Sequence, residues 1–461
     1  MLWGAGVAHA QSLPANPGDA SPASEPADEI WNLHAQTTLI VHHKAAFAAA
    51  YTNANGSPNS LRPEAENTYT ATATLFAGVR PWRNGEIYLV PELISEHPLS
   101  RLHGLGGSIQ NAELEKNGVA FPSVYRSRLF LRQTWNFGGA AGRQESGAML
   151  LGKSLTERRF VLTVGNTAVI DIFDRGTYAG DVRMQFMSMN FLTHAAYDFA
   201  ADARGYSWGV AGEFLFDSWA VRAGRFIAPK DPNQLALDFR IWKNYGDQLE
   251  FEHRHVFHGL PGKVRVVGYR NREVMGRWDD AVSAWRMDPA RNATTCAGFS
   301  YESENAGAPD LCWARRSNVK MGAGLTIEQA LSDEIGAFAK GMISDGNTEV
   351  YSYTSADSSW SLGLVSTGRR WRRSFDSAGV GYAQNAISES HATYLGLGGV
   401  DGFIGDGGIR RAPERAFEIY YNLSVTRWSW IALDYQRVAN PGYNADRGPV
   451  NLFGGRVRLA L

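Results

Sequence analysis

The chain has 461 residues, of which 44% are hydrophobic and 20% charged, and its formal net charge is -1. This composition excludes a disordered or nucleic-acid-binding protein, since there is no basic excess and no tract rich in Lys and Arg. No apolar stretch reaches the ~20 residues that a membrane helix needs, but a barrel strand can span a membrane with ~10 residues, half of them polar. The 49 glycines and 12% aromatic residues suit a large all-β protein.

The first 28 residues precede the expected folded domain. Residues 1–10 match the end of a signal peptide, since an apolar stretch is followed by a small-x-small cleavage site at Ala8 and Ala10. An ordinary disordered N-terminus is the alternative. Residues 11–28 are rich in Pro, Ala and Ser and predict a flexible lead. We therefore expect a single domain over residues 29–461.

Apolar and polar residues alternate through most of the remaining chain. A period of two places successive side chains on opposite faces and indicates a β-strand. Phe417 and Ile419, for example, lie on one face of such a run, and Glu418 and Tyr420 on the other. We count about 16 runs, an even number of the kind that bacterial barrels use. They cover 31–41, 67–80, 84–94, 124–137, 158–168, 206–217, 218–228, 246–256, 261–274, 317–330, 332–342, 358–368, 376–388, 413–426, 428–439 and 450–461.

The connections between these runs differ in length on the two sides of the predicted sheet. Most links after even-numbered runs are short and those after odd-numbered runs are long; 138–157 and 369–375 depart from this rule. A transmembrane barrel has short turns on one rim and long loops on the other. Within the long loops we expect a short helix at 108–118, and a loop with a helix at 186–203 folded against or into the lumen. The sequence therefore predicts an all-β, transmembrane antiparallel β-barrel with short helices in its long loops.

One face of several runs bears charged side chains. An arginine or lysine on the lipid face near the midplane costs about 2–4 kcal/mol, so the charged face is expected to point into the barrel. Mixed arginine and glutamate there allow two interpretations: cross-strand ion pairs that hold the barrel round, or a selectivity lining that hydrogen-bonds sugar hydroxyls. Aromatic residues could add stacking surfaces for sugar rings. The candidate lining residues are Trp82, Glu86, Tyr88, Glu92, Arg126, Arg128, Phe130, Arg132, Glu250, Glu252, Arg265 and Glu418.

The two cysteines, Cys296 and Cys312, fall in one predicted loop. In an oxidising compartment they would form a disulfide that closes this loop and contributes about 3 kcal/mol. Two unrelated thiols are the alternative. The pair lacks the spacing of metal ligands, and no hydrolase elbow or zinc-protease motif is present. We therefore expect neither an enzyme nor a bound metal or cofactor.

Five segments bear a family resemblance. They are 82–93 (WRNGEIYLVPEL), 125–135 (YRSRLFLRQTW), 160–174 (FVLTVGNTAVIDIFD), 197–209 (YDFAADARGYSWG) and 413–450. In order and content they resemble the OprB family of carbohydrate-selective outer-membrane porins. The resemblance implies a 16-stranded barrel of the bacterial outer membrane that admits neutral sugars by diffusion through a waist lined by arginine and glutamate. By motif it points to Glu86, Glu92, Arg128 and Arg132, with Trp82 and Tyr88 beside them.

The partners implied by this reading are a carbohydrate solute and outer-membrane lipid, with no nucleic acid; a homo-oligomer is compatible with it. The near-zero net charge favours a neutral solute. The alternative is an outer-membrane conduit for polysaccharide export that works with periplasmic partners. That function predicts a more uniformly charged lumen than the mixed arginine and glutamate found here.

Overall fold

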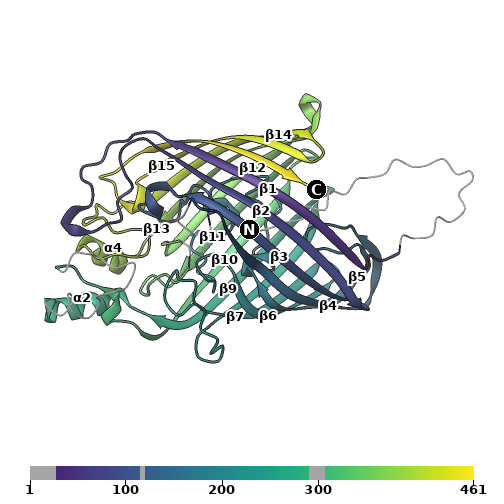
Figure 1. Cartoon of the computed structure of the whole chain (residues 1–461), viewed down its shortest axis with the longest axis horizontal. Helices are drawn as coiled ribbons and strands as arrows, with labels where there is room; N and C mark the ends of the chain where they lie inside the picture. The colour runs from purple at the N-terminus through teal and green to yellow at the C-terminus, as the bar shows by residue number, and fades with distance from the viewer. Residues whose placement is uncertain (1–26, 115–119, 290–306, 353) are drawn as a thin grey trace, which may run out of the picture.

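Sixteen antiparallel strands close into one barrel in the part of the chain that the structure describes. The computed structural model describes residues 27–114, 120–289, 307–352 and 354–461. Each strand pairs with its neighbours in sequence, and β1 pairs with β16 to close the ring (Figure 1). The predicted fold class is confirmed. The strands are β1 (Trp31–Lys44), β2 (Glu66–Trp82), β3 (Gly85–His97), β4 (Ser123–Gln144), β5 (Lys153–Thr167), β6 (Ser207–Phe216), β7 (Trp219–Ile227), β8 (Tyr245–Phe257), β9 (Leu260–Met275), β10 (Arg316–Ala330), β11 (Ile335–Ser344), β12 (Ser358–Gly368), β13 (Arg373–Ala386), β14 (Glu414–Thr426), β15 (Ser429–Ala439) and β16 (Val450–Ala460).

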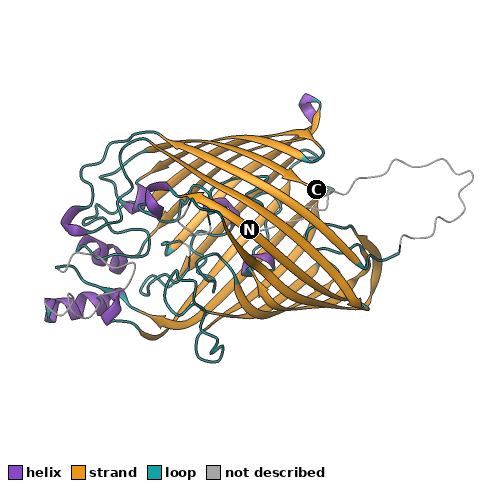
Figure 2. Ribbon diagram, viewed as in Figure 1, coloured by secondary structure: helices purple, strands orange, loops and turns teal. Residues whose placement is uncertain are grey.

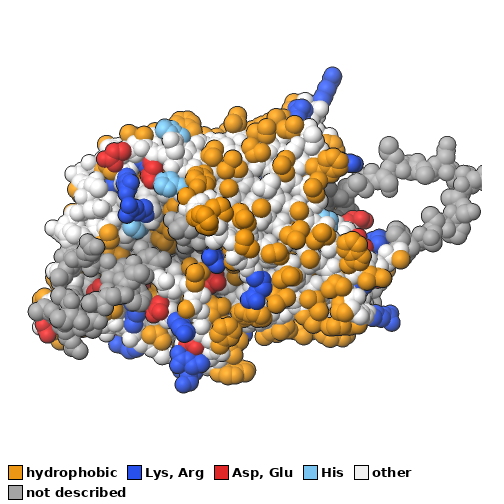
Figure 3. All heavy atoms as spheres, viewed as in Figure 1, with side chains coloured by type: hydrophobic (Ala, Val, Ile, Leu, Met, Phe, Trp, Pro, Cys, Tyr) orange, Lys and Arg blue, Asp and Glu red, His pale blue; other side chains and the backbone are white. Residues whose placement is uncertain are grey.

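The two faces of the barrel wall differ in polarity as the alternation predicts. On β2, Thr72 and Thr74 are buried inside, whereas Ala73 and Leu75, which alternate with them, are exposed outside. Hydrophobic side chains cover much of the outer surface over the strands (Figure 3). Closure leaves no free strand edge, so the wall's backbone groups are paired within the sheet, as a hydrocarbon environment requires. No helix in the described ranges is long and apolar enough to cross a membrane.

The short turns all lie on one rim. The two links that broke the sequence rule are shorter than predicted, because β4 extends to Gln144, β5 begins at Lys153, and β13 begins at Arg373. The strand pairs beside these two connections contain register irregularities, at 136–141 in the β4–β5 pair and at 367–368 in the β12–β13 pair. A bulge inserts an extra residue and interrupts the alternation from which strands are recognised.

The described helices lie in the long connections, mainly at the opposite end of the barrel (Figure 2). They are α1 (Met189–Leu192), α2 (Trp278–Met287) and α4 (Glu389–Gly396), besides short 3-10 turns. The helix expected at 108–118 is wrong for its described part, because 108–114 form bends and a turn; 115–118 lie outside the described residues. Cys296 also lies outside them, so the Cys296–Cys312 bridge stays a prediction.

Two long connections fold into the barrel. The connection 168–206, here called the inward loop, contains α1 and is buried over most of its length, as predicted for 186–203. Its Phe186 and Phe191 pack against each other and against Phe338 of the wall, with ring centroids 4.7–6.2 Å apart. The second connection, 98–122, meets the inward loop where Ala112 N–H donates to the Met187 carbonyl at 2.8 Å. These segments narrow the lumen.

Candidate permeation site

Carboxylates of the barrel wall bind the backbone of the inward loop. Glu418 on β14 accepts hydrogen bonds from the backbone N–H groups of Met187 and Ser188, at 2.5 and 3.1 Å. Glu250 on β8 accepts from Asp174 N–H at 2.6 Å. An ionised carboxylate is an acceptor with two oxygens, so one side chain can satisfy two N–H groups of an irregular segment. Both glutamates therefore point inward as predicted, but the described structure uses them to hold the loop.

Cations of the wall bind the loop's carbonyls in the same way. Lys340 on β11 donates to the carbonyl oxygens of Phe191 and Leu192, at 2.6 and 3.2 Å. Arg456 on β16 donates to those of Val182 and Gln185, at 2.6 and 2.8 Å. Buried backbone groups without partners are costly. Part of the charged inner face thus holds the inward loop in place. This is a structural role for the charges, one of the two kinds of role that the sequence left open.

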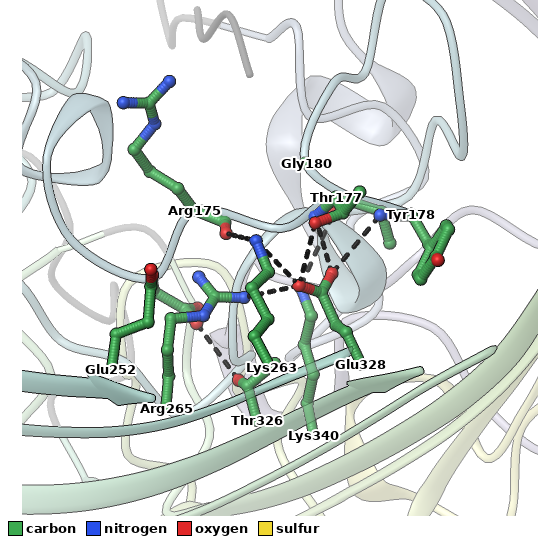
Figure 4. Close-up of polar contacts among 12 residues, drawn as sticks. Arg175, Thr177, Tyr178, Gly180, Glu252, Lys263, Arg265, Thr326, Glu328 and Lys340 are labelled. Atoms are coloured by element: carbon green, nitrogen blue, oxygen red, sulfur yellow. Dashed lines mark hydrogen bonds and ion pairs between the residues drawn. The ribbon is translucent and has the colours of Figure 1, made fainter. Parts of the chain in front are cut away.

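A second group of charges lies around three cations that reach solvent, Arg132, Arg175 and Lys263. We call it the lumen cluster: Arg132, Arg175, Glu252, Lys263, Arg265 and Glu328. Its central acceptor is Glu328 on β10, whose Oε2 lies 3.0 Å from Lys263 Nζ and 3.2 Å from Arg265 Nη2. Figure 4 shows these wall residues reaching up to the inward loop. The Lys263 side chain is 21% exposed, against 1% for Arg265, so the lysine is the more accessible of the two.

The inward loop contributes residues 175–178 to this cluster. Glu328 accepts from the N–H groups of Thr177 and Tyr178, at 2.6 and 3.3 Å, while Lys263 donates to the Arg175 carbonyl at 3.4 Å. The Arg175 side chain points away from Glu328 (Figure 4) and is exposed, although it lies within electrostatic reach of Arg132 and other charges of the lumen. The loop thus presents a guanidinium to the water-filled part of the barrel.

Carboxylates on β6 and β8 surround a third cation. Arg222 on β7 contacts Glu213 at 2.9 Å, Glu250 at 2.7 Å and Glu252 at 3.2 Å. One arginine is thereby shared by three carboxylates, which leaves the local balance acidic. Arg265 and Lys263 on the adjacent strand offset that excess. The predicted lining residues Glu250, Glu252 and Arg265 therefore belong to one connected charge network.

The motif on β3 and β4 forms a packed group that shares Arg132 with the lumen cluster. Glu86 is fully buried and lies 2.8 Å from Lys153 Nζ and 3.9 Å from Arg132 Nη1. The rings of Tyr88 and Phe130 are buried with centroids 5.1 Å apart, and the Arg132 guanidinium lies 5.4 and 5.2 Å from them. Such cation–π contacts orient a guanidinium. The two aromatic rings support Arg132 and do not present open faces on which a sugar could stack.

Glu92 binds one residue of the neighbouring strand β4 and one of the inward loop instead of facing solvent. Its carboxylate accepts from Tyr125 Oη at 2.5 Å and from Arg183 of the inward loop at 3.0 Å. Arg183 in turn donates from Nε to Glu113 at 2.7 Å. Arg128 is likewise paired with Asp171, at 2.6 Å. Both motif residues therefore lie inside the barrel as predicted, within buried contacts.

Two predicted lining residues are on the wrong side of the wall. Alternation in the sequence puts Arg126 on the face of Arg128, but a register shift at Ser127 turns Arg126 outward. Its guanidinium lies 5.1 Å from the Trp208 ring, and the side chain is exposed. A second shift before Trp82 moves that indole to the outer side of the short-turn rim. One extra residue reverses the face of every residue beyond it.

Several residues of the network were missed from the sequence. Lys263 shares parity with Arg265 on β9, so its inward direction could have been predicted. Arg222 lies in a predicted run and could have been found by the same rule. Arg175 and Arg183 belong to a loop without periodicity, and no sequence signal indicated which of the loop residues would reach the wall.

A closed sixteen-stranded barrel with an apolar outer face, a charged interior and a loop folded inside it is an outer-membrane channel of the porin class. The profile of the family described as "Carbohydrate-selective porin, OprB family" matches residues 59–461. The chain belongs to this family, and thus to the channel proteins of the bacterial outer membrane rather than to enzymes.

Two solved structures are similar to the chain over most of its length. Pseudomonas putida OprB in its high-pH structure has a TM-score of 0.68 and 14% sequence identity, with 94% of each chain covered. The outer-membrane channel DcaP of Acinetobacter baumannii has a TM-score of 0.48 and 8% identity, covering 94% of this chain and 97% of that one. No curated protein matches the sequence. At such identities the first of these structures supports the fold, and the assignment to the family comes from the profile.

Proposed function

We propose that the protein lets neutral saccharides diffuse passively through the outer membrane, past the lumen cluster. The observation behind this proposal is the pairing of buried charges beside the partly exposed Lys263. Glu328 is shared by Lys263 and Arg265, and Glu252 lies 3.2 Å from Arg222. Paired charges largely cancel, so they leave little net field to attract a charged solute. Their polar groups can still exchange hydrogen bonds with a neutral solute.

Accessible donors lie beside these pairs. Lys263 and Arg175 are in contact with solvent, and the half-buried Tyr178 lies next to Glu328. Sugar hydroxyls both donate and accept, so a saccharide can replace water along such a wall. Tyr178, and not Tyr88 or Phe130, is then the aromatic available to an apolar sugar face. The proposal thus assigns selectivity to the place where the inward loop meets β9 and β10.

The test is single-channel conductance of the purified protein in a planar bilayer, with added mono- and oligosaccharides. We expect sugars to reduce the ion current, and Lys263→Met to weaken this block while Arg265 keeps Glu328 paired. Loss of one hydrogen bond to a charged group corresponds to about tenfold in the sugar's dissociation constant. The matched control is Arg286→Gln, because Arg286 is an exposed arginine on α2 that does not belong to the lumen cluster. A wild-type current that no sugar affects would contradict the proposal.

The same measurement separates diffusion from polysaccharide export. A passive porin conducts in a bilayer without any other protein, whereas an export conduit depends on its periplasmic partners. Current from the purified protein alone, blocked by short sugars, supports diffusion. A closed channel that opens only with a cell-envelope partner would favour export.

A further inference from the structure

A polar hollow of about 620 Å³ lies outside the lumen cluster, between the β1–β2 and β3–β4 connections. Its lining includes Asn53, Ser60, Arg62, Arg101 and His103. These residues belong to long connections, so the hollow is at the end of the barrel opposite the short turns. Lysine, arginine and histidine side chains are visible at that end (Figure 3).

Two arginines in this hollow have no partner in the described chain. Neither the Arg62 nor the Arg101 side chain forms an ion pair or hydrogen bond with another described residue, and both are exposed. His103 lines the same hollow, where burial lowers the pKa of its imidazole and the charges of Arg101 and Arg62 lower it further. A neutral imidazole and two guanidiniums therefore share one concave surface with the carboxylates of Glu64 and Glu66, of which Glu66 is bound by Ser100.

The backbone around Arg101 is held in an uncommon conformation. Ser100, Arg101 and Leu102 have φ values of 46°, 58° and 73°, three consecutive non-glycine residues in the left-handed region. Such strain persists where surrounding contacts enforce it, and it is concentrated at binding sites. Here Glu66 enforces it, because its carboxylate accepts from the Ser100 N–H at 2.7 Å and from the Ser100 hydroxyl at 2.9 Å.

The same turn fixes the backbones that carry the two arginines relative to each other. Ser100 Oγ accepts a hydrogen bond from the Arg62 N–H at 3.0 Å, so the backbones of Arg62 and Arg101 are joined through one residue. Nearby, Asn53 and Ser60 exchange two hydrogen bonds between backbone and side chain, at 2.9 and 3.0 Å. The walls of the hollow are thus organised before any ligand binds.

The chemistry of the lining defines the ligand class. A pair of guanidiniums binds a phosphate or carboxylate through parallel charge-assisted hydrogen bonds. The carboxylate of Glu64 and the polar groups of Asn53 and Ser60 suit hydroxyls better than a second negative charge. We propose that this hollow binds an anionic saccharide, whose phosphate or carboxylate lies between Arg62 and Arg101. This site is distinct from the lumen cluster and does not depend on passage of neutral sugars through it.

Two sources could supply this group: a free sugar phosphate or sugar acid in the medium, or a phosphorylated glycolipid of the surrounding outer leaflet. The experiment titrates the full-length protein in detergent with glucose 6-phosphate, glucuronate and glucose, by calorimetry. It also measures phosphorylated glycolipid retained through purification, by mass spectrometry. The variants are Arg62→Gln/Arg101→Gln and the control Arg286→Gln on α2. Heat-modifiable migration in gels confirms that each variant is folded.

We expect binding of an anionic saccharide, in at least one of the two assays, to fall tenfold or more in the double variant and to be unchanged in the control. Loss confined to the titration assigns the site to free solutes, and loss confined to retained glycolipid assigns it to lipid; either supports the proposal. Equal binding by wild type and the double variant in both assays would overturn it. So would the absence of any anionic saccharide binding, or a loss of glucose binding in the double variant as large as its loss of glucose 6-phosphate binding.

Discussion

Arg128 and Asp171 form a bidentate ion pair that joins strand β4 to the inward loop. Arg128 Nε lies 2.6 Å from Asp171 Oδ2, and Nη2 lies 2.9 Å from Oδ1. The Thr167 hydroxyl and the Ala168 N–H also donate to Oδ2, at 2.8 and 3.1 Å. Arg128 was predicted from the sequence as a lining residue, but its side chain is 1% exposed and its donors are directed to the loop.

Replacing Arg128 with methionine should therefore act mainly on the position of the loop. The change leaves the Asp171 carboxylate buried without its cation, a situation that typically costs about 3–5 kcal/mol. We expect unfolding at a lower urea concentration. We also expect a larger single-channel conductance with more fluctuation, because the loop is held less firmly in the lumen. The double variant Arg128→Met/Asp171→Asn removes both charges and should recover much of the lost stability. Equal stability of the single variant and wild type would show that the pair does not hold the loop.

Glu418 allows a test of the carboxylate contacts that hold the middle of the loop. Glutamine at this position keeps one acceptor but turns an NH₂ group toward one of the two N–H donors of Met187 and Ser188. A buried donor without an acceptor costs about 1–3 kcal/mol. We expect Glu418→Gln to lower the unfolding midpoint and to speed hydrogen exchange at 187–188. Glu334→Gln, which alters an exposed pair with Arg370 at 2.8 Å, is the control and should change neither.

Residue positions could be predicted from the sequence for the barrel wall but not for the inward loop. Strand positions are set by a local period of two, so the faces of Glu86, Arg132 and Glu250 could be predicted without coordinates. Arg126 shows where the rule ends, since the bulge at Ser127 depends on pairing with β3 and leaves no local pattern. The wall was therefore predictable except beyond its irregularities.

The role of each inward residue was not predictable in the same way. Glu418 and Lys263 are both charged residues on the inward face of a predicted strand. Glu418 nevertheless accepts hydrogen bonds from loop N–H groups, whereas Lys263 is partly exposed. The difference arises from the path of the inward loop, whose contacts join residues more than 80 positions apart, such as Lys263 and Arg175. Contacts of this kind come from tertiary packing and not from local periodicity.

Gly336 on β11 makes room for Tyr178 of the inward loop. A Cβ at Gly336 would lie 2.0 Å from Tyr178 Cε1, so alanine there forces the ring to move. Overpacking typically costs about 1–3 kcal/mol. We expect Gly336→Ala to change the sugar block of the channel more than its ion conductance, because the backbone N–H of the displaced Tyr178 donates to Glu328 of the lumen cluster. Gly341→Ala on the same strand is the matched control, since the nearest atom to its added Cβ is 3.9 Å away. Identical sugar block in both variants would contradict a role for Tyr178.

His391 on α4 joins three of the long connections at the mouth of the barrel. Its Nδ1 lies 3.1 Å from Asp357 and its Nε2 3.1 Å from Asp401, while its ring stacks on Trp278 of α2 at 4.0 Å. Burial lowers the pKa of His391, but the Asp357 carboxylate, with Asp401, outweighs this effect and raises it to about 9. The imidazolium is therefore the form held between the two carboxylates.

The raised pKa fixes the direction of a pH dependence. Because the folded value of about 9 exceeds the usual 6.5, the stabilisation is fully present below pH 6.5 and is lost as pH rises through 9. A shift of this size corresponds to about 3 kcal/mol in the buried site. We expect hydrogen exchange in α2 and α4 to accelerate between pH 6 and pH 10 beyond the intrinsic rate increase, and His391→Gln to exchange fast at both pH values. Protection in the variant equal to wild type at pH 6 would show that this cation does not hold the connections together.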